Sequence, residues 1–239
     1  MTVPPWRKGR IVRIEDRAPD TKSFWIEAFE SETFPFEPGQ FVTLDLPIGE
    51  KPAKRWRSYS IASWPDNSNI FELIIIHKNE GPGTEYLFTR VSTGTEIVFR
   101  GPQGKFLLPP IVDRDLFLIC TGTGIAPFRS MLHHLIRNNV PHKNIYLIFG
   151  TRTEKDLLYR EEFSELSKTL PHFRYVPVLS RAEWVGEKGY VHQVYEKMVT
   201  EKKPAYFYLC GWKKMIEEAK NNLLTLGYER KDIHYEIYG

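Results

Sequence analysis

The chain of 239 residues changes its pattern at two adjacent prolines, Pro109 and Pro110. Before them, short runs of β-branched and aromatic residues are separated by Pro, Gly, Asp and Asn, which is typical of antiparallel strands joined by turns. After them, continuous apolar runs alternate with segments of helical spacing, which indicates parallel strands connected by helices. Because two adjacent prolines break regular structure, we predict two domains, residues 1–110 and residues 111–239.

The first predicted domain contains six strand segments and one helical candidate, residues 84–91. Antiparallel strands at this spacing indicate a sandwich or a small barrel. The strand segments are GRIVRIED, KSFWIEAF, QFVTLDL, RSYSIAS, IFELIIIHK and TEIVFRG.

The second predicted domain alternates strands with helices, which predicts βαβ units and a parallel sheet. Its strand segments are DLFLIC, NIYLIFG, FRYVPVLS, AYFYLCG and IHYEIY. The helical segments between them are PFRSMLHHLIRN, LLYREEFSELSKTL, VHQVYEKMV and KKMIEEAKNNLLTL. The last strand would tie the end of the chain, with Glu236 and Tyr238, into this sheet.

A glycine loop joins the first strand of the second domain to its first helix. In CTGTGIAPFRS, Gly122 and Gly124 permit a tight turn and let backbone N–H groups approach a phosphate, and Pro127 is expected at the first helical position. The start of this helix offers positive potential to a pyrophosphate. Because Pro127 occupies the third glycine position of the G-x-G-x-x-G pattern, a plain strand-to-helix turn explains this stretch equally well.

Polar residues after the third strand of the second domain suit a second phosphate. Arginine gives a bidentate contact, lysine a point charge and tyrosine a stacking face for an adenosine 2′-phosphate. We therefore expect NADP rather than NAD, although Glu183 and Glu187 lie nearby and an NAD site carries an acidic residue. The residues of this cluster are Ser180, Arg181, Lys188 and Tyr190.

The segment RSYS in the first domain is the other concentrated signal. On a strand, Arg57 and Tyr59 share one face, so the arginine can hold a phosphate while the tyrosine stacks on a ring system. Ser60 points the other way, but its backbone or hydroxyl can reach the edge of a ring. An Arg–Tyr cross-strand pair explains RSYS alone. However, residues 81–84 form a second glycine-rich helix start suited to a diphosphate, which favours the binding interpretation.

Composition narrows the partners and the compartment. A formal charge of +3 is too weak to indicate nucleic acid but can favour an acidic protein partner. The two cysteines, Cys120 and Cys210, neither supply the four thiolates of an iron–sulfur cluster nor resemble a disulfide framework, so we expect no metal and a cytoplasmic, reducing compartment. No stretch approaches the ~18 apolar residues of a membrane span, and we expect a monomer.

Together these residues resemble the ferredoxin–NADP reductase family over essentially the whole chain. The resemblance implies an antiparallel six-stranded Greek-key β-barrel that binds FAD, followed by a parallel-sheet, Rossmann-like α/β domain that binds NADP(H). It also implies that Arg57 binds the flavin pyrophosphate, that Tyr59 flanks the isoalloxazine and that Ser60 hydrogen-bonds near N5. The other flavin-binding residues on this resemblance are Ser58, Gly81, Gly83 and Thr84.

The resemblance also assigns the nicotinamide side. Cys210 would contact the nicotinamide, Glu236 would assist near it, and Tyr238 would cover the flavin face as a movable lid. Gly239 follows the tyrosine, which departs from the aromatic end of the family. The catalytic residues would be Ser60, Cys210, Glu236 and Tyr238, and the NADP-binding residues would be Gly122, Thr123, Gly124, Pro127, Ser180, Arg181, Lys188 and Tyr190.

The activity implied is hydride transfer from NADPH to FAD, followed by single-electron transfer to an acidic ferredoxin or flavodoxin. The basic residues that could dock such a partner are Arg7, Lys8, Arg10, Lys51, Lys54 and Arg55. Two other functions stay open on the sequence: a reductase of free flavin, a cytochrome or an oxygenase partner, and a non-catalytic flavin- or nucleotide-binding regulatory subunit. FMN in place of FAD also stays open, as does the degree of preference for NADPH over NADH.

Overall fold

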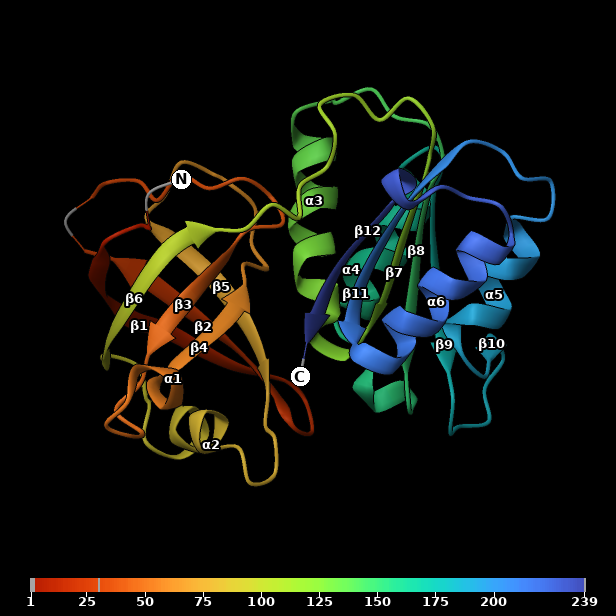
Figure 1. Ribbon diagram of the computed structural model, residues 1–239. Helices are drawn as coiled ribbons and strands as arrows, with labels where there is room; N and C mark the ends of the chain where they lie inside the picture. Colours follow the sequence, from red (N-terminus) through yellow and green to blue (C-terminus); the bar gives the residue numbers. More distant parts are fainter. Residues whose placement is uncertain (1–2, 30, 239) are drawn as a thin grey trace. The chain divides into compact units, whose positions relative to one another are not determined.

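The computed structural model describes residues 3–29 and 31–238, which form two compact units (Figure 1). The first unit comprises the described residues up to Leu107 together with Ala126–Arg137. The second unit comprises Leu108–Ile125 and the described residues from Asn138 onward. These units are defined only by which residues pack together, and the division into domains at residue 110 stays a prediction.

The first unit is built on a six-stranded antiparallel sheet with the order β4-β3-β6-β1-β2-β5. An isolated bridge between Ile61 and Leu73 links the chain after β4 to β5, so the two ends of this order meet and the sheet closes into a barrel. β6 returns to lie beside β3, which is the Greek-key connection. The strands are β1 (Trp6–Ala18), β2 (Thr21–Ala28), β3 (Phe41–Asp45), β4 (Trp56–Ser60), β5 (Ile70–Ile76) and β6 (Glu96–Gln103).

The interior of this barrel is aromatic. Phe71 and Phe99 are fully buried and meet edge to face, with ring centroids 5.2 Å apart. Phe34 packs against both rings, at 4.7 and 5.7 Å. Such pairs contribute roughly 0.5–1.5 kcal/mol beyond the burial of their area. β4, which carries Arg57 and Tyr59, is one strand of the barrel whose interior these rings fill.

Three helices belong wholly or mostly to the first unit. α2 (Pro82–Thr89) is the expected helix, and it begins two residues early because proline suits a first helical position. α1 (Pro52–Arg55) has only four residues, too few to produce a helical pattern in the sequence. α3 (Ile125–Arg137) contributes all but its first residue to this unit.

A buried ion pair holds α3 within the first unit. Glu72 of β5 is 2% exposed and Arg129 of α3 is 8% exposed, and Arg129 Nη1 donates to Glu72 Oε2 at 2.8 Å. The hydroxyl of Ser23 donates to Glu72 Oε1 at 2.5 Å, and Arg17 lies 3.6 Å from the same oxygen. The carboxylate is therefore surrounded by donors, which is the condition under which a buried charge is tolerated.

The second unit is built on a six-stranded parallel sheet with the order β10-β9-β8-β7-β11-β12. Five strands are those expected, whereas the two residues of β10, Glu187 and Lys188, carry no apolar pattern. The strands are β7 (Asp115–Thr121), β8 (Ile145–Thr151), β9 (Phe173–Leu179), β10 (Glu187–Lys188), β11 (Ala205–Trp212) and β12 (Ile233–Tyr238). The helices are α4 (Arg160–Thr169), α5 (Val191–Met198) and α6 (Lys213–Thr225).

The strand order reverses between β7 and β11. From β7 the chain moves outward through β8 to β9, and it then returns to place β11 and β12 on the other side (Figure 1). Ligands of open α/β sheets bind at such a reversal, beyond the carboxyl ends of the strands. β12 pairs with β11 from Ile233 to Tyr238, so the described end of the chain is tied into the sheet as expected.

We expect Arg129→Ala to destabilise the first unit by about 3–5 kcal/mol, because the buried Glu72 carboxylate loses its guanidinium partner. Lys168→Ala, which removes the exposed ion pair with Glu165 in α4, is the control and should leave the unfolding midpoint nearly unchanged. Urea denaturation followed by tryptophan fluorescence measures both variants. Equal midpoints would show that the buried pair contributes little.

Candidate functional site

The glycine loop lies at the reversal point of the parallel sheet. β7 ends at Thr121, and the 3₁₀ turn Gly122–Gly124 leads directly into α3. A Cβ on Gly124 would lie 2.3 Å from the carbonyl oxygen of Cys210 in β11, so only glycine permits this approach. Gly122 has a φ of +53°, in the left-handed region that glycine tolerates. The turn, with Thr123 at its centre, thus has the backbone shape that a phosphate-binding loop needs.

Pro127 is the third residue of α3, not the first helical residue, so the expected position is wrong by two residues. The physical reason is that the first four N–H groups of a helix have no partner within the helix. Proline is therefore tolerated anywhere in this first turn. The role of Pro127 in cofactor binding stays a prediction.

The four residues expected to hold a 2′-phosphate lie together at the carboxyl end of β9. Ser180 and Arg181 directly follow Leu179, the last residue of this strand, and Lys188 pairs in register with Leu179. Tyr190 precedes α5 and is 68% exposed. The fold thus gathers a hydroxyl, two cations and an aromatic ring from eleven residues of the chain, 180–190.

Arg152 belongs to the same cluster, although the sequence does not predict it as a site residue. It follows β8, and its carbonyl oxygen accepts a hydrogen bond from the backbone N–H of Arg181 at 2.9 Å. Both arginine side chains are exposed. The rule that ligands bind beyond strand ends, applied to the segment NIYLIFGTR as well, is the signal that could have found it.

Lys188 is paired with a carboxylate of the neighbouring loop. Its Nζ forms a hydrogen-bonded ion pair with Glu183, which lowers the pKa of Glu183 below its ordinary value. Both side chains are exposed, so the pair exchanges readily with solvent ions. A phosphate at this cluster would compete with Glu183 for the lysine.

Cys210 is in register with a titratable residue on each of its two neighbouring strands. It is in register with Cys120 of β7 on one side and with Glu236 of β12 on the other. Burial raises the pKa of the Cys210 thiol well above its ordinary value, and the nearby Glu236 carboxylate raises it further. Burial raises the pKa of the Cys120 thiol in the same direction. Both thiols are therefore neutral near pH 7 and serve as packing surfaces rather than nucleophiles.

Glu236 and Tyr238 are both half-buried near the end of β12, and Tyr238 is in register with Trp212 of β11. Residues two apart on a strand share a face, so the carboxylate and the phenol lie on one side of the sheet. Their contacts with a cofactor stay predictions.

In the first unit, Arg57 and Tyr59 share one face of β4, as the alternation predicts. Burial raises the pKa of Tyr59 to about 12, and the charge of Arg57 partly offsets this effect. The phenol is therefore neutral near pH 7. Ser58 faces the opposite side, where its hydroxyl lies 3.0 Å from that of Thr43, and Ser60 at the end of the strand is buried.

Arg57 lies directly against the start of α2. A Cβ on Gly83 would lie 3.0 Å from both Cγ and Nε of Arg57. The hydroxyl of Thr84 accepts a hydrogen bond from the N–H of Lys78 at 3.0 Å, and a Cβ on Gly81 would lie 2.9 Å from this hydroxyl oxygen. A guanidinium beside a helix N-terminus binds anions. These residues therefore fit the diphosphate of a flavin dinucleotide.

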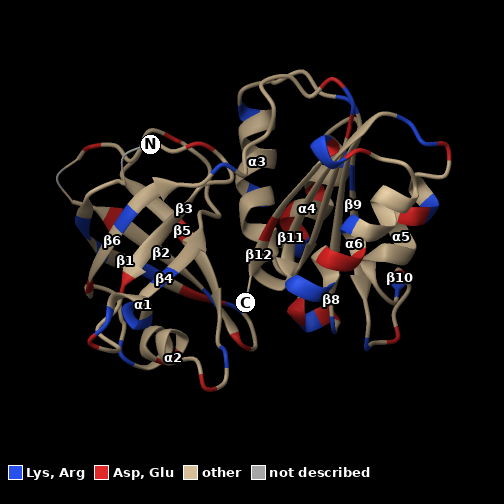
Figure 2. Cartoon of the chain, viewed as in Figure 1, with Lys and Arg blue, Asp and Glu red and all other residues tan. Residues whose placement is uncertain are grey.

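Three of the six basic residues expected to dock an acidic partner form ion pairs within the first unit, and Figure 2 shows both signs of charge interspersed over it. The ion pairs are Lys8–Glu96 at 3.9 Å, Arg10–Glu27 at 2.7 Å and Arg55–Asp45 at 2.7 Å. Arg7 lies over the ring of Phe34. Among the described residues, no carboxylate is paired with Lys51 or Lys54, which are both exposed. Charge alone thus gives this surface a weak preference for an acidic partner.

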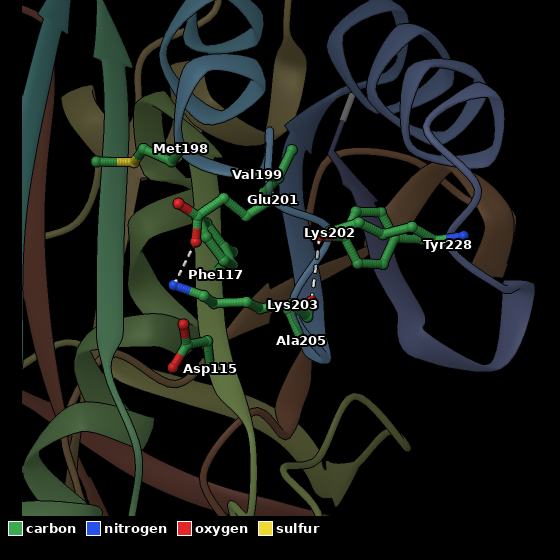
Figure 3. Close-up of a pocket in the computed structure, with 9 residues that line it drawn as sticks. All are labelled: Asp115, Phe117, Met198, Val199, Glu201, Lys202, Lys203, Ala205 and Tyr228. Carbon is green, nitrogen blue, oxygen red and sulfur yellow. Dashed lines mark hydrogen bonds and ion pairs between the residues drawn. The ribbon is translucent and has the colours of Figure 1, made fainter.

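A small pocket of about 30 Å³ lies at the end of the parallel sheet that is opposite to the glycine loop (Figure 3). Asp115 and Ala205, the first residues of β7 and β11, line it, so it lies at the amino ends of the strands. Lys203 beside it pairs with Glu201 at 2.6 Å and accepts a hydrogen bond from the Tyr228 hydroxyl through its carbonyl oxygen. The pocket has room for about one or two water molecules and not for a cofactor.

Two further properties concern membranes and metals. Within residues 3–29 and 31–238, no helix is both long and apolar enough to cross a membrane. The same residues contain no group of three or more His, Cys, Asp or Glu side chains placed to hold a metal ion.

Comparison with known proteins gives two family matches. Residues 8–107 match the oxidoreductase FAD-binding domain, and residues 118–221 match the oxidoreductase NAD-binding domain. The first match includes Arg57 and Gly83, and the second includes the glycine loop, Arg181 and Cys210. The expectation of FAD and a nicotinamide dinucleotide as cofactors is thereby confirmed.

Individual proteins are similar over nearly the whole chain. Ferredoxin--NADP reductase B of Sorangium cellulosum is 33% identical over 240 residues, which cover 97% of each chain. Phenol hydroxylase P5 protein of Acinetobacter pittii is 29% identical over 97% of this chain and 65% of its own. The crystal structure of a ferredoxin NADP+ reductase from Neisseria gonorrhoeae with bound FAD and NADP has a TM-score of 0.81 at 26% identity, over 97% of this chain and 98% of that one. Both the barrel and the parallel sheet are therefore shared with reductases.

We expect Gly83→Ala to weaken FAD retention about tenfold or more, because the added methyl group displaces Arg57 and a hydrogen bond to a charged group contributes roughly 1.5–3 kcal/mol. The measurement is the flavin absorbance of the purified protein relative to its protein absorbance. Thr89→Ala, at the other end of α2, controls for loss of helix stability. Equal flavin contents in the two variants would mean that FAD does not bind at this turn.

Proposed function

Because the chain belongs to the ferredoxin–NADP reductase family of FAD- and NAD(P)-binding oxidoreductases, we propose that it takes a hydride from NADPH and delivers single electrons to a ferredoxin or a flavodoxin. Its membership makes it an FAD- and NAD(P)-dependent electron-transfer reductase. The observation that carries the finer proposal is the exposed cation cluster at the carboxyl end of β9, which suits the 2′-phosphate of NADPH.

In the first unit, Arg57 would hold the FAD diphosphate against the first turn of α2, where residues 81–84 leave room for it. Tyr59 is a neutral phenol, so it offers a ring face for stacking without bringing a charge to the flavin. Ser60 would offer its hydroxyl to the ring edge near N5, with Ser58 beside it on the strand. When bound, FAD supplies the ability to accept a hydride and to release electrons one at a time.

In the second unit, the turn Gly122–Gly124 and the start of α3 would hold the NADPH diphosphate. Ser180 and Arg181 would bind the 2′-phosphate together with Lys188, which would exchange Glu183 for the phosphate. Tyr190 would stack on the adenine, and Arg152 would add a second guanidinium. NADH lacks the phosphate, so it would leave these cations without an anionic partner.

The groups near the reacting atoms come from two neighbouring strands. Cys210 would pack against the nicotinamide as a neutral thiol, and Glu236, in register with it, would hold a proton close to the reaction. Tyr238 would cover the flavin until the nicotinamide replaces it. The resemblance supplies these roles, and the in-register placement of the strand ends supports them.

A second function, the reduction of an oxygenase partner, is favoured by the similarity to the reductase component DmpP of phenol 2-monooxygenase from Pseudomonas sp.. The same residues would serve the hydride step, and only the acceptor would differ. The weak charge preference of the first unit is compatible with both acceptors. We also propose a cytoplasmic location, because both cysteines are free and buried.

Anaerobic titration tests the proposed function. We expect a yellow protein whose flavin absorbance is bleached by NADPH at a concentration about 10–100-fold lower than by NADH, because charge-assisted bonds to the 2′-phosphate contribute roughly 1.5–3 kcal/mol each. Ferredoxin or flavodoxin added afterwards should restore the absorbance. Reoxidation by an oxygenase component, but by neither carrier, would favour the second function.

Matched arginine variants locate the coenzyme preference. Arg181→Ala should raise the NADPH concentration needed for bleaching about tenfold and leave that of NADH unchanged. Arg174→Ala removes an exposed arginine from the body of β9 and is the control. If the two variants behave alike, the 2′-phosphate binds elsewhere.

The two cysteines form a matched pair for the hydride step. We expect Cys210→Ser to slow flavin bleaching by NADPH at least about tenfold, because a displaced nicotinamide reacts poorly even after a shift of ~1 Å. Cys120→Ser, its in-register neighbour in the core, should keep the wild-type rate. Stopped-flow absorbance measures both, and equal rates would remove Cys210 from the site.

A further inference from the structure

Trp212 is an exposed aromatic residue beside the glycine loop, and none of the roles above includes it. It is the last residue of β11 and is 54% exposed, whereas Cys210 and Gly211 before it are buried. An exposed tryptophan forgoes the burial of a large apolar surface. Its place at the reversal point of the sheet raises the question of what covers it.

The backbone fixes Trp212 at this position. Its N–H donates to the hydroxyl oxygen of Thr121, at the end of β7, at 3.3 Å. Gly211 makes this contact possible, because its φ is +137° and a Cβ there would lie 2.3 Å from the same oxygen. The end of β11 is thereby tied to the strand that leads into the glycine loop.

The indole ring nitrogen faces the loop itself. A Cβ on Gly122 would lie 3.9 Å from Trp212 Nε1, which is ordinary van der Waals distance. Within the described part of the chain, this N–H has no hydrogen-bond acceptor. An indole is a donor only, so its free N–H suits an anion that binds at the loop.

Helix capping does not explain the residue. Trp212 is the N-cap of α6, but its side chain makes no capping bond and has no acceptor with which to make one. The two lysines that follow, Lys213 and Lys214, lie 3.7 and 3.8 Å from Glu217 and Glu218 one turn further on. The position therefore forgoes the cap that serine or aspartate would supply, which is expected where function overrides local stability.

We propose that Trp212 binds the diphosphate of the nicotinamide dinucleotide. Its Nε1–H donates to a phosphate oxygen held at the Gly122–Gly124 turn, and its ring covers one side of the diphosphate. The charge of the phosphate strengthens this bond relative to a neutral one. The inference rests on the proposed function, because it needs a dinucleotide at the loop. Trp212 would thus bring a side-chain donor to a turn whose other donors are backbone N–H groups.

Calorimetric titration of the full-length holoprotein tests the assignment with three probes. NADP+ contains the 2′-phosphate, the diphosphate and the nicotinamide. 2′-Phospho-ADP-ribose keeps the diphosphate but lacks the nicotinamide, and 2′-AMP lacks both the diphosphate and the nicotinamide. Trp212→Phe removes the donor and keeps a ring, and Trp212→Ala removes both. Trp6→Phe, which alters a partly exposed tryptophan of β1, is the matched control.

We expect Trp212→Phe to weaken NADP+ and 2′-phospho-ADP-ribose by the same factor of about ten, and Trp212→Ala by more, with 2′-AMP and the control unchanged. Unchanged affinities in both Trp212 variants would overturn the proposal and leave the proposed function intact. So would a loss confined to NADP+, which would assign the ring to the nicotinamide, or an equal loss for 2′-AMP. Failure of the wild-type protein to bind any of the three would overturn the proposed function together with this inference.

Discussion

The buried carboxylate of Glu72 is the interaction on which the first unit depends. Bringing a charge out of water costs several kcal/mol per ion, so Glu72 is compatible with folding only where Arg129 and Ser23 meet it. Arg129 lies in α3, and this helix must therefore pack against β5. The same helix follows the glycine loop directly in the chain.

In the second unit, two glycines let the chain after β7 approach the end of β11: Gly124 in the turn that follows β7, and Gly211 in β11. Gly124 approaches the carbonyl of Cys210, and Gly211 approaches the hydroxyl of Thr121. The turn after β7 and the end of β11 therefore lie directly against each other, and the Thr121 hydroxyl joins them by accepting the Trp212 N–H. Trp212 follows Gly211 directly, and its indole nitrogen lies beside Gly122 of the loop.

Long elements were predictable because burial dictates their sequence, whereas short or distant features were not. The strands of both sheets appear as alternating or continuous apolar runs, and Arg57 and residues 81–84 each carry a phosphate signal. Their direct contact is tertiary and has no local trace, and neither has the pair of Glu72 with Arg129, 57 residues apart. α1 and β10, with four and two residues, are too short for an apolar pattern to repeat. Arg152 was missed for a different reason. It follows β8, whereas the 2′-phosphate was expected only at residues that follow β9.

Buried and exposed residues serve the two kinds of contact proposed here, namely contact with uncharged rings and binding of phosphates. Desolvation disfavours charge, so Tyr59 and Cys210 stay neutral, as their proposed contacts with uncharged rings require. The proposed 2′-phosphate site needs cations that remain hydrated until the ligand arrives, and Arg152 and Arg181 are exposed. In the first unit, Lys8, Arg10 and Arg55 already have carboxylate neighbours, and Coulomb attraction between exposed charges fades beyond about 8–10 Å in physiological salt. Net charge therefore gives only a weak preference among the proposed electron acceptors.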